Sequence, residues 1–107
     1  MAKINLMYHD VYIRDVNESG FNRERDLMYK MDVVTFESHV KNIHNLCRQK
    51  SLPLENIVFT FDDGGKSFLD VIAPILDKYG FKGLFFISTK YIGTDTFLNK
   101  ADIVELH

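Results

Sequence analysis

The sequence is poor in cysteine and tryptophan. Among its 107 residues it has one cysteine, Cys47, and no tryptophan. A single cysteine excludes an intrachain disulfide and gives no information on the redox compartment. No apolar run approaches the roughly 20 residues that a membrane-spanning helix needs, so we expect no membrane span. The first seven residues are too short for a signal-peptide core and have no small-residue cleavage site. As written, the sequence predicts a cytoplasmic protein, and an envelope or extracellular one if a signal was removed.

The sequence also lacks an excess of basic charge. It has 13 basic and 15 acidic residues, a net charge of −2, and no Lys/Arg cluster interleaved with aromatic residues. This pattern gives no support to nucleic-acid binding. Hydrophobic residues make up 46% of the chain and charged residues 26%, which is ordinary for a globular protein. We expect residues 1–107 to form a single domain with a modest core.

The most informative stretch is an apolar run, Ile57–Phe61, that ends in two adjacent aspartates and two glycines: Asp62, Asp63, Gly64 and Gly65. The run predicts a buried strand. Ligands of α/β folds bind at the carboxyl ends of the strands. Because neighbouring residues of a strand point to opposite sides, we expect different tasks for the two carboxylates, such as metal binding and proton transfer. The glycines would allow positive φ and close approach of a ligand. A solvated Asp-Asp-Gly turn is the alternative.

Two further strands are expected on either side of this run. Lys3–His9 alternates loosely and predicts a first strand, and Gly83–Ile87 predicts a third. If the strands are parallel, His9 and Asp10 lie at the same edge as the two aspartates. The alternative for His9 is a histidine at the border of the core, which shapes the site without binding metal.

Helical patterns separate the predicted strands. We expect Thr35 to cap a helix that runs to about Lys50, after a short strand at Val33–Val34. The apolar stripe of this helix is formed by Phe36, Val40, Ile43 and Cys47. Strands that alternate with helices predict a parallel α/β sheet with helical crossovers.

Three other segments complete the expected order of elements. Ser67 is a candidate cap for a helix that Pro74 should kink or split and that Gly80 should end. Residues 11–30 read as a long polar loop without a site. The segment 99–107 predicts the start of another helix.

Three motifs carry a resemblance to a known family. Thr60–Gly64 (TFDDG) resembles the first motif of the polysaccharide deacetylases, carbohydrate esterase family 4. Tyr8–Asp10 (YHD) resembles the entry segment of the subgroup that deacetylates poly-N-acetylglucosamine. Gly80–Ile87 resembles the next strand of the family. The resemblance implies the N-terminal part of a distorted (β/α) barrel with parallel strands.

The resemblance also implies a chemistry. Members of the family hydrolyse N-acetyl or O-acetyl groups of polysaccharides with a divalent metal, usually zinc and sometimes cobalt or nickel. Transferred to this sequence, Asp62 is the catalytic base and Asp63 the metal ligand. His9, Asp10, Gly64 and Gly65 are expected around the substrate pocket. The expected partner is an acetylated polysaccharide.

One feature of the family has no counterpart in the sequence. The second motif supplies two histidines as metal ligands, whereas His107 is the only histidine after Asp63. We therefore expect an incomplete deacetylase domain that carries only the first catalytic motif. An incomplete barrel would leave Val58, Phe59 and residues 84–86 without covering partners, which predicts self-association through the open sheet edge.

Two other functions fit parts of the pattern. A phosphoryl-transfer enzyme or receiver domain also places aspartates after apolar strands, but the third strand here ends in Ile87-Ser88-Thr89 and offers no further aspartate. A non-catalytic deacetylase-like fragment that binds a glycan or a protein is the closer alternative.

Overall fold

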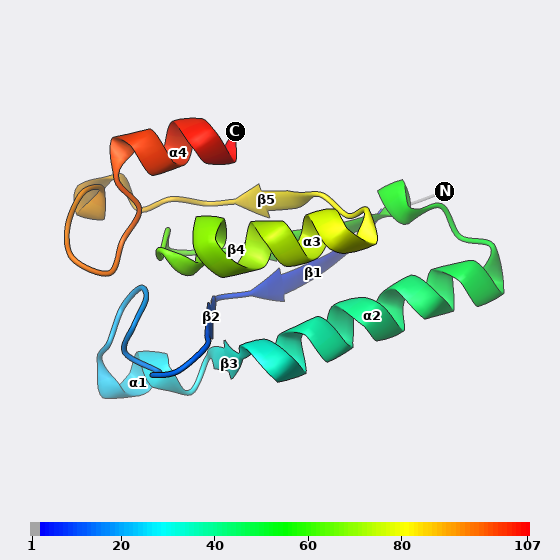
Figure 1. Cartoon of the computed structure of the whole chain (residues 1–107), viewed down its shortest axis with the longest axis horizontal. Coiled ribbons are helices and arrows are strands. Elements are labelled where there is room, and N and C mark those ends of the chain that lie inside the picture. The colour runs from blue at the N-terminus through cyan, green and yellow to red at the C-terminus, as the bar shows by residue number, and fades with distance from the viewer. Residues whose placement is uncertain (1–2) are drawn as a thin grey trace.

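A computed structural model describes residues 3–107, and its central element is a sheet of three parallel strands. These are β1 (Ile4–Tyr8), β4 (Ile57–Phe61) and β5 (Gly83–Phe85), in the spatial order β1-β4-β5. All three run in the same direction, so the segments that follow them gather at one end of the molecule (Figure 1). The predicted parallel α/β sheet is confirmed, with slightly shorter first and third strands.

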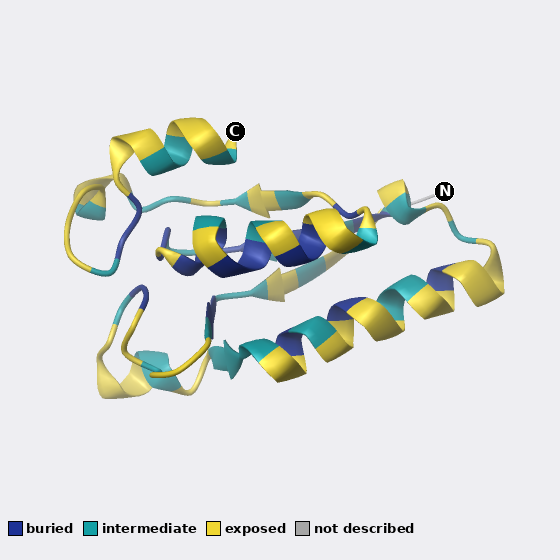
Figure 2. Ribbon diagram, in the orientation of Figure 1, coloured by how far each residue is buried: buried dark blue, intermediate teal, exposed yellow. Residues whose placement is uncertain are grey.

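Two crossover segments cover one face of this sheet. The first contains α2 (Val33–Lys50), and the second contains a π-helical turn, η2 (Phe68–Ile72), followed by α3 (Ala73–Tyr79). The buried residues of α2 and α3 lie on the sides that face the sheet and each other (Figure 2). The expected stripe of α2 is confirmed, since Phe36, Val40 and Cys47 are buried and Ile43 packs against the core.

The start of α2 differs from the prediction. Thr35 does not cap the helix; instead the carboxylate of Asp32 accepts a hydrogen bond from the backbone N–H of Thr35 at 2.9 Å. Val33 and Val34 form the first residues of the helix and not a short strand. Two β-branched residues favoured a strand in isolation, but an aspartate cap directly before them is the stronger local signal.

The helix after the aspartates is split, as expected from Pro74. A π-helical turn precedes the α-helical part, and the proline lies in the first turn of α3, where its missing N–H costs no helical hydrogen bond. Gly80 ends the helix with φ of +78°, also as expected. Ser67, however, has helical backbone angles and makes no cap, because its hydroxyl is bonded elsewhere.

Residues 11–30 are not a structureless loop, which corrects the expectation for this segment. Two short strands, β2 (Asp10–Tyr12) and β3 (Lys30–Asp32), pair in parallel, and α1 (Glu24–Leu27) lies between them. Three-residue strands leave too short a pattern for sequence periodicity to detect. This second sheet lies next to the carboxyl end of β1 (Figure 1).

Three shorter helical elements complete the chain. η1 (Leu54–Asn56) leads into β4, η3 (Thr89–Tyr91) follows β5, and α4 (Lys100–Leu106) ends the chain. The expected final helix is confirmed, with Asn99 as its cap. Within residues 3–107, no helix combines the length and the apolar character that a membrane span requires.

The other face of the sheet is not covered by helices. Alternation along β4 buries Ile57, Phe59 and Phe61 and leaves Val58 and Thr60 half-buried. The uncovered face, which carries Val58 and Thr60, also exposes Met7 (71%), Leu84 (52%) and Phe86 (56%). The expectation that Phe59 and Phe85 lack covering partners is wrong. Both lie on the helix-covered face, where Phe59 is fully buried and Phe85 packs against the core.

Candidate active site

The carboxyl ends of β1 and β4 bring the predicted site residues together. The backbone N–H of Asp62 donates to the carbonyl of Tyr8 at 3.2 Å, which extends the pairing of the two strands by one residue. Alternation therefore carries Asp62 to the uncovered face of the sheet, on the same side as Val58 and Thr60. By the same rule His9 follows Asn5 and Met7 on that face.

Asp63 occupies an unusual backbone conformation next to His9. Its φ is +86°, a left-handed value that aspartate tolerates better than most residues. Oδ2 of Asp63 lies 3.6 Å from Nδ1 of His9, and both side chains are about one-third exposed, 36% and 35%. The carbonyl of Asp63 accepts a hydrogen bond from the N–H of Ser88, at 3.3 Å, so the segment after β5 also holds this residue. Local strain of this kind is often found at functional sites.

The two glycines of the motif serve different purposes. Gly64 has φ of +91°, and a β-carbon there would meet Ile87 Cγ2 at 3.1 Å. Gly65 does not have positive φ, so that part of the expectation is wrong. A β-carbon on Gly65 would instead lie 2.5 Å from Ser19 Oγ and 2.8 Å from Asp10 Oδ2. Gly65 is therefore needed for close packing against the protein itself.

Asp10 is a buried carboxylate beneath the motif, with 6% of its surface exposed. Its Oδ1 accepts the N–H of Val11 at 3.0 Å and the hydroxyl of Ser67. Burial raises the pKa of Asp10, against the hydrogen bonds of Ser67 and Ser19 and the charge of Lys30, which lower it. The sequence predicted Asp10 near the substrate pocket. The structure shows, in addition, that its side chain is hydrogen-bonded to Ser67, in the segment after Gly65.

Lys30, the register partner of Asp10 in the β2–β3 pair, supplies a positive charge near the Asp10 carboxylate. Its ammonium group donates to the carbonyls of Val16 (2.8 Å) and Ser19 (2.5 Å) and to Oδ1 of Asn22 (2.6 Å). Burial lowers the pKa of Lys30, whereas the charge of Asp10 raises it. The lysine thus fixes the 16–22 loop against β3.

A pocket of about 170 Å³ opens beside His9, Asp10 and Asp63. The predicted site residues Asp62, Gly64 and Gly65 do not line it. Three of its lining residues, His9, Asp10 and Asp63, were predicted from the sequence. The other five lie within residues 21–30, in the segment that the sequence predicted to be a loop. No local motif marks them, and only the β2–β3 pairing brings them to β1. The lining residues are His9, Asp10, Phe21, Arg23, Asp26, Tyr29, Lys30 and Asp63.

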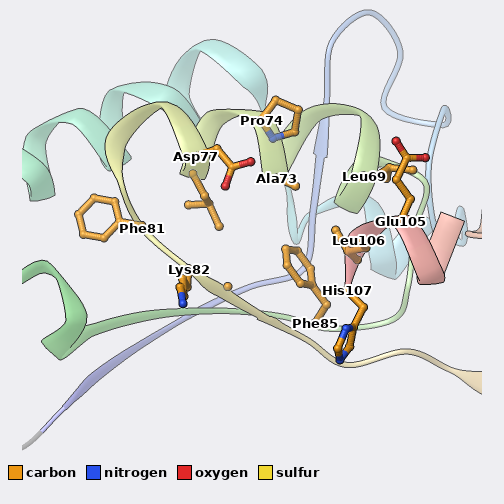
Figure 3. A pocket seen from close by; sticks show the side chains of 12 residues that line it. Leu69, Ala73, Pro74, Asp77, Phe81, Lys82, Phe85, Glu105, Leu106 and His107 are labelled. Atoms are coloured by element: carbon orange, nitrogen blue, oxygen red, sulfur yellow. The ribbon is translucent and has the colours of Figure 1, made fainter.

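A larger pocket, of about 530 Å³, lies elsewhere, between α3, β5 and α4 (Figure 3). Its lining includes the polar side chains of Asp77, Lys82, Glu105 and His107 and the apolar ring of Phe85. Neither aspartate of the motif lines this pocket. His107 therefore belongs to a different region from Asp63.

Two side chains with metal-binding chemistry lie close together at the turn. Asp63 offers a carboxylate oxygen, a donor that divalent cations accept, and the nearby His9 offers an imidazole nitrogen. In residues 3–107 no group of three or more His, Cys, Asp or Glu side chains is arranged to hold a metal ion. Catalytic zinc sites usually have three protein ligands. The donor chemistry fits a divalent cation, and the number of ligands is below that of a complete zinc site.

Comparison with solved structures gives two deacetylases. One is the Streptococcus pyogenes deacetylase PplD in complex with acetate, with a TM-score of 0.64 and 18% identity over 99% of this chain and 52% of that chain. The other is a de-N-acetylase from Aggregatibacter actinomycetemcomitans, with a TM-score of 0.64 and 18% identity over 95% of this chain and 49% of that chain. This chain spans about half the length of both, and at this identity they show a shared fold.

Comparison at the level of sequence gives the family. No curated protein sequence matches the chain. The family model described as polysaccharide deacetylase matches residues 49–105, more than half of the chain, including β4, both aspartates and β5. The matched region contains the motif from which the resemblance was first inferred. The chain therefore belongs to the polysaccharide deacetylase family.

Proposed function

We propose that this chain carries the first catalytic motif of a metal-dependent polysaccharide deacetylase. The observation that carries the proposal is the turn at the end of β4, where Asp62 is followed by the strained Asp63, which lies 3.6 Å from His9 at the carboxyl edge of a parallel sheet. Family membership supports deacetylation of a polysaccharide in general. The substrate we propose is an N-acetylated or O-acetylated glycan.

The two aspartates would have separate tasks. Asp63 would hold a divalent cation, zinc or alternatively cobalt or nickel, with His9 beside it shaping the pocket. When bound, such a cation supplies a water of lowered pKa and polarises an acetyl carbonyl. Asp62 would accept the proton that the attacking water loses. Water attack on the acetyl carbon would break its bond to the sugar nitrogen or oxygen, which takes up the proton first accepted by Asp62, so that acetate and the free amine or hydroxyl are the products.

Neighbouring groups would place the substrate. Tyr29 is 59% exposed, lines the pocket and lies with its ring centroid 5.0 Å from that of His9. Its ring offers an apolar face at the rim of a polar pocket, a combination suited to a ligand that is itself both apolar and polar. Backbone N–H groups near the turn would stabilise the oxyanion of the tetrahedral intermediate.

A non-catalytic role is the second candidate. The observation that favours it is the ligand set, since residues 3–107 offer fewer than the three protein ligands of a usual catalytic zinc site. In that case the same pocket would bind a glycan or a protein partner without hydrolysis. The self-association expected from the open edge of β5 is compatible with both roles.

Metal binding and acetate release distinguish the two candidates. Isothermal titration with Co²⁺ and Zn²⁺ should show binding to the chain that Asp63→Asn abolishes and Asp62→Asn retains. Any acetate release from N-acetylglucosamine oligomers in the presence of Co²⁺ should be lost in both variants. Cation binding that is unchanged in Asp63→Asn would contradict the proposed ligand, and glycan binding without acetate release would favour the non-catalytic role.

A further inference from the structure

We infer that Asp10, acting through Ser67, is a positioning residue for the turn that carries Asp62 and Asp63. The inference rests on the proposed function, because it concerns the geometry of the proposed metal ligand. Its structural basis is a side-chain hydrogen bond between residues 57 positions apart, one at the start of β2 and the other two residues after the Asp-Asp-Gly-Gly turn.

The turn needs restraint from outside because its backbone is strained. Asp63 and Gly64 both have positive φ, +86° and +91°, and such conformations persist in non-glycine residues only where surrounding structure fixes them. Two carbonyls of the turn are held from one side: Ser88 N–H donates to Asp63, at 3.3 Å, and Leu98 N–H donates to Gly64, at 3.0 Å. These bonds come from segments after β5.

The opposite end of the turn is held by the segment around β2. The hydroxyl of Ser67 donates to Oδ1 of Asp10, and the N–H of Ser67 donates to Oγ of Ser19 at 2.9 Å. All three side chains are buried, with exposures of 3% for Ser67, 6% for Asp10 and 3% for Ser19. Buried polar groups that lose a partner are costly, so this end of the turn is fixed in one arrangement.

Asp10 is itself held rigidly. Its register partner in the β2–β3 pairing is Lys30, and its Oδ1 also accepts the N–H of Val11. Its Oδ2 lies in a space that only the absence of β-carbons at Gly20 and Gly65 leaves open. A rigid carboxylate that binds the segment after the turn can therefore transmit its own position to Asp63, which lines the same pocket.

The experiment compares Ser67→Ala and Asp10→Asn with a control that weakens the fold elsewhere. Ser67→Ala removes the donor, while Asp10→Asn keeps an acceptor oxygen in place of Oδ1. Cys47→Ala removes a buried side chain near the end of α2, away from the β2–β3 pair and the turn, and serves as the control. The readouts are the NMR shifts of Asp63 and Gly64 and the hydrogen exchange of the Ser88 and Leu98 amides, all measurable without metal.

We expect Ser67→Ala to shift the Asp63 and Gly64 resonances and to speed exchange of the Ser88 and Leu98 amides by about tenfold. Co²⁺ affinity should fall by about tenfold, as when the partner of a metal ligand is removed. Asp10→Asn should retain most of both properties, and Asp10→Ala should behave like Ser67→Ala. The double variant Asp10→Ala/Ser67→Ala should show no larger change in amide exchange or Co²⁺ affinity than either alanine variant alone, because the two residues act as one unit.

Unchanged Asp63 and Gly64 resonances in folded Ser67→Ala, or changes no larger than those in Cys47→Ala, would overturn the inference. If Asp10→Ala and Ser67→Ala lower Tm without altering the turn, the pair is structural only. Failure of the proposed function has a different signature, since Co²⁺ binding would then be insensitive to Asp63→Asn in the otherwise unchanged chain.

Discussion

Gly20 packs directly against the carboxylate of Asp10: a β-carbon on Gly20 would lie 2.1 Å from Oδ2 of Asp10. Its φ is +71°, and its N–H donates to the carbonyl of Thr96 at 2.8 Å. The 19–20 segment, the turn after β4 and the 94–98 segment therefore meet at one place. Substitutions at this place should affect the fold and the site together.

We predict that Gly20→Ala is strongly destabilising. The left-handed backbone should cost about 1–2 kcal/mol, and the collision with Asp10 about 1–3 kcal/mol more. Gly93→Ala is a matched control, because Gly93 has φ of +82° but no atom within 4 Å of an added β-carbon. Urea denaturation of both variants should show a clearly larger loss in Gly20→Ala. Equal losses would show that the packing against Asp10 has no energetic effect.

Asp63 should be a residue at which the fold and the function conflict. Because its φ is +86°, Asp63→Gly relieves backbone strain, whereas Asp63→Ala keeps it. We expect the glycine variant to be more stable than the alanine variant by about 1–2 kcal/mol, with Co²⁺ binding absent from both. Thermal denaturation and calorimetry test the two parts separately. A glycine variant less stable than the alanine variant would show that the turn is not strained.

Phe61 should be one of the most important core residues. It is fully buried, and its ring lies 5.2 Å from that of Phe85 and 5.7 Å from that of Tyr8. Phe61→Ala should lower the free energy of unfolding by about 3–5 kcal/mol. Phe86→Ala, on the uncovered face with 56% exposure, should lower it by about 1 kcal/mol or less. Chemical denaturation that ranks the two variants in the opposite order would contradict the assignment of the two faces.

Glu18 should contribute pH-dependent stability. Burial raises the pKa of its carboxyl, but hydrogen bonds from the N–H groups of Asp15, Arg14 and Ile13 outweigh this effect, so the pKa lies below its ordinary value of 4.5. A lowered native pKa gives stabilisation that is present above pH 4.5 and is lost as the pH falls through the native pKa.

Glu18→Gln tests this directly, since glutamine keeps an acceptor and loses the charge. The stability difference from the parent chain should be largest near neutral pH and should disappear in acid, as measured by thermal unfolding from pH 7 to pH 3. Glu105→Gln, at an exposed position of α4, is the control. A difference that stays constant with pH would show that the hydrogen bonds of Glu18 do not depend on its charge.

The uncovered face of the sheet should mediate self-association. Leu84 and Phe86 are more than half exposed on and beside β5, an edge strand of the parallel sheet, and open edges pair readily with other chains. We expect concentration-dependent association in sedimentation velocity that Leu84→Lys and Phe86→Lys suppress. Val34→Lys, at an equally apolar position of α2 with 77% exposure, should leave it unchanged. A chain that stays monomeric at high concentration would contradict this prediction.

The sequence by itself determined the elements that rest on local chemistry. The apolar run before Asp62 and Asp63 predicted β4 and the place of the two carboxylates, because a strand that ends in charged residues must present them at its edge. Pro74 and Gly80 predicted the split and the end of the second crossover helix, since proline and glycine act through their own backbone. The family was also evident from these residues.

The tertiary structure decided what depends on residues far apart. Nothing near Asp10 in the sequence indicates that it binds Ser67, and nothing near Phe21, Tyr29 or Lys30 places them at the pocket. Three-residue strands such as β2 and β3 exist only because they pair with each other. The same holds for the positive φ of Asp63, which its neighbours in space impose. Local patterns thus located the Asp62-Asp63 motif, and long-range pairing built the pocket beside Asp63.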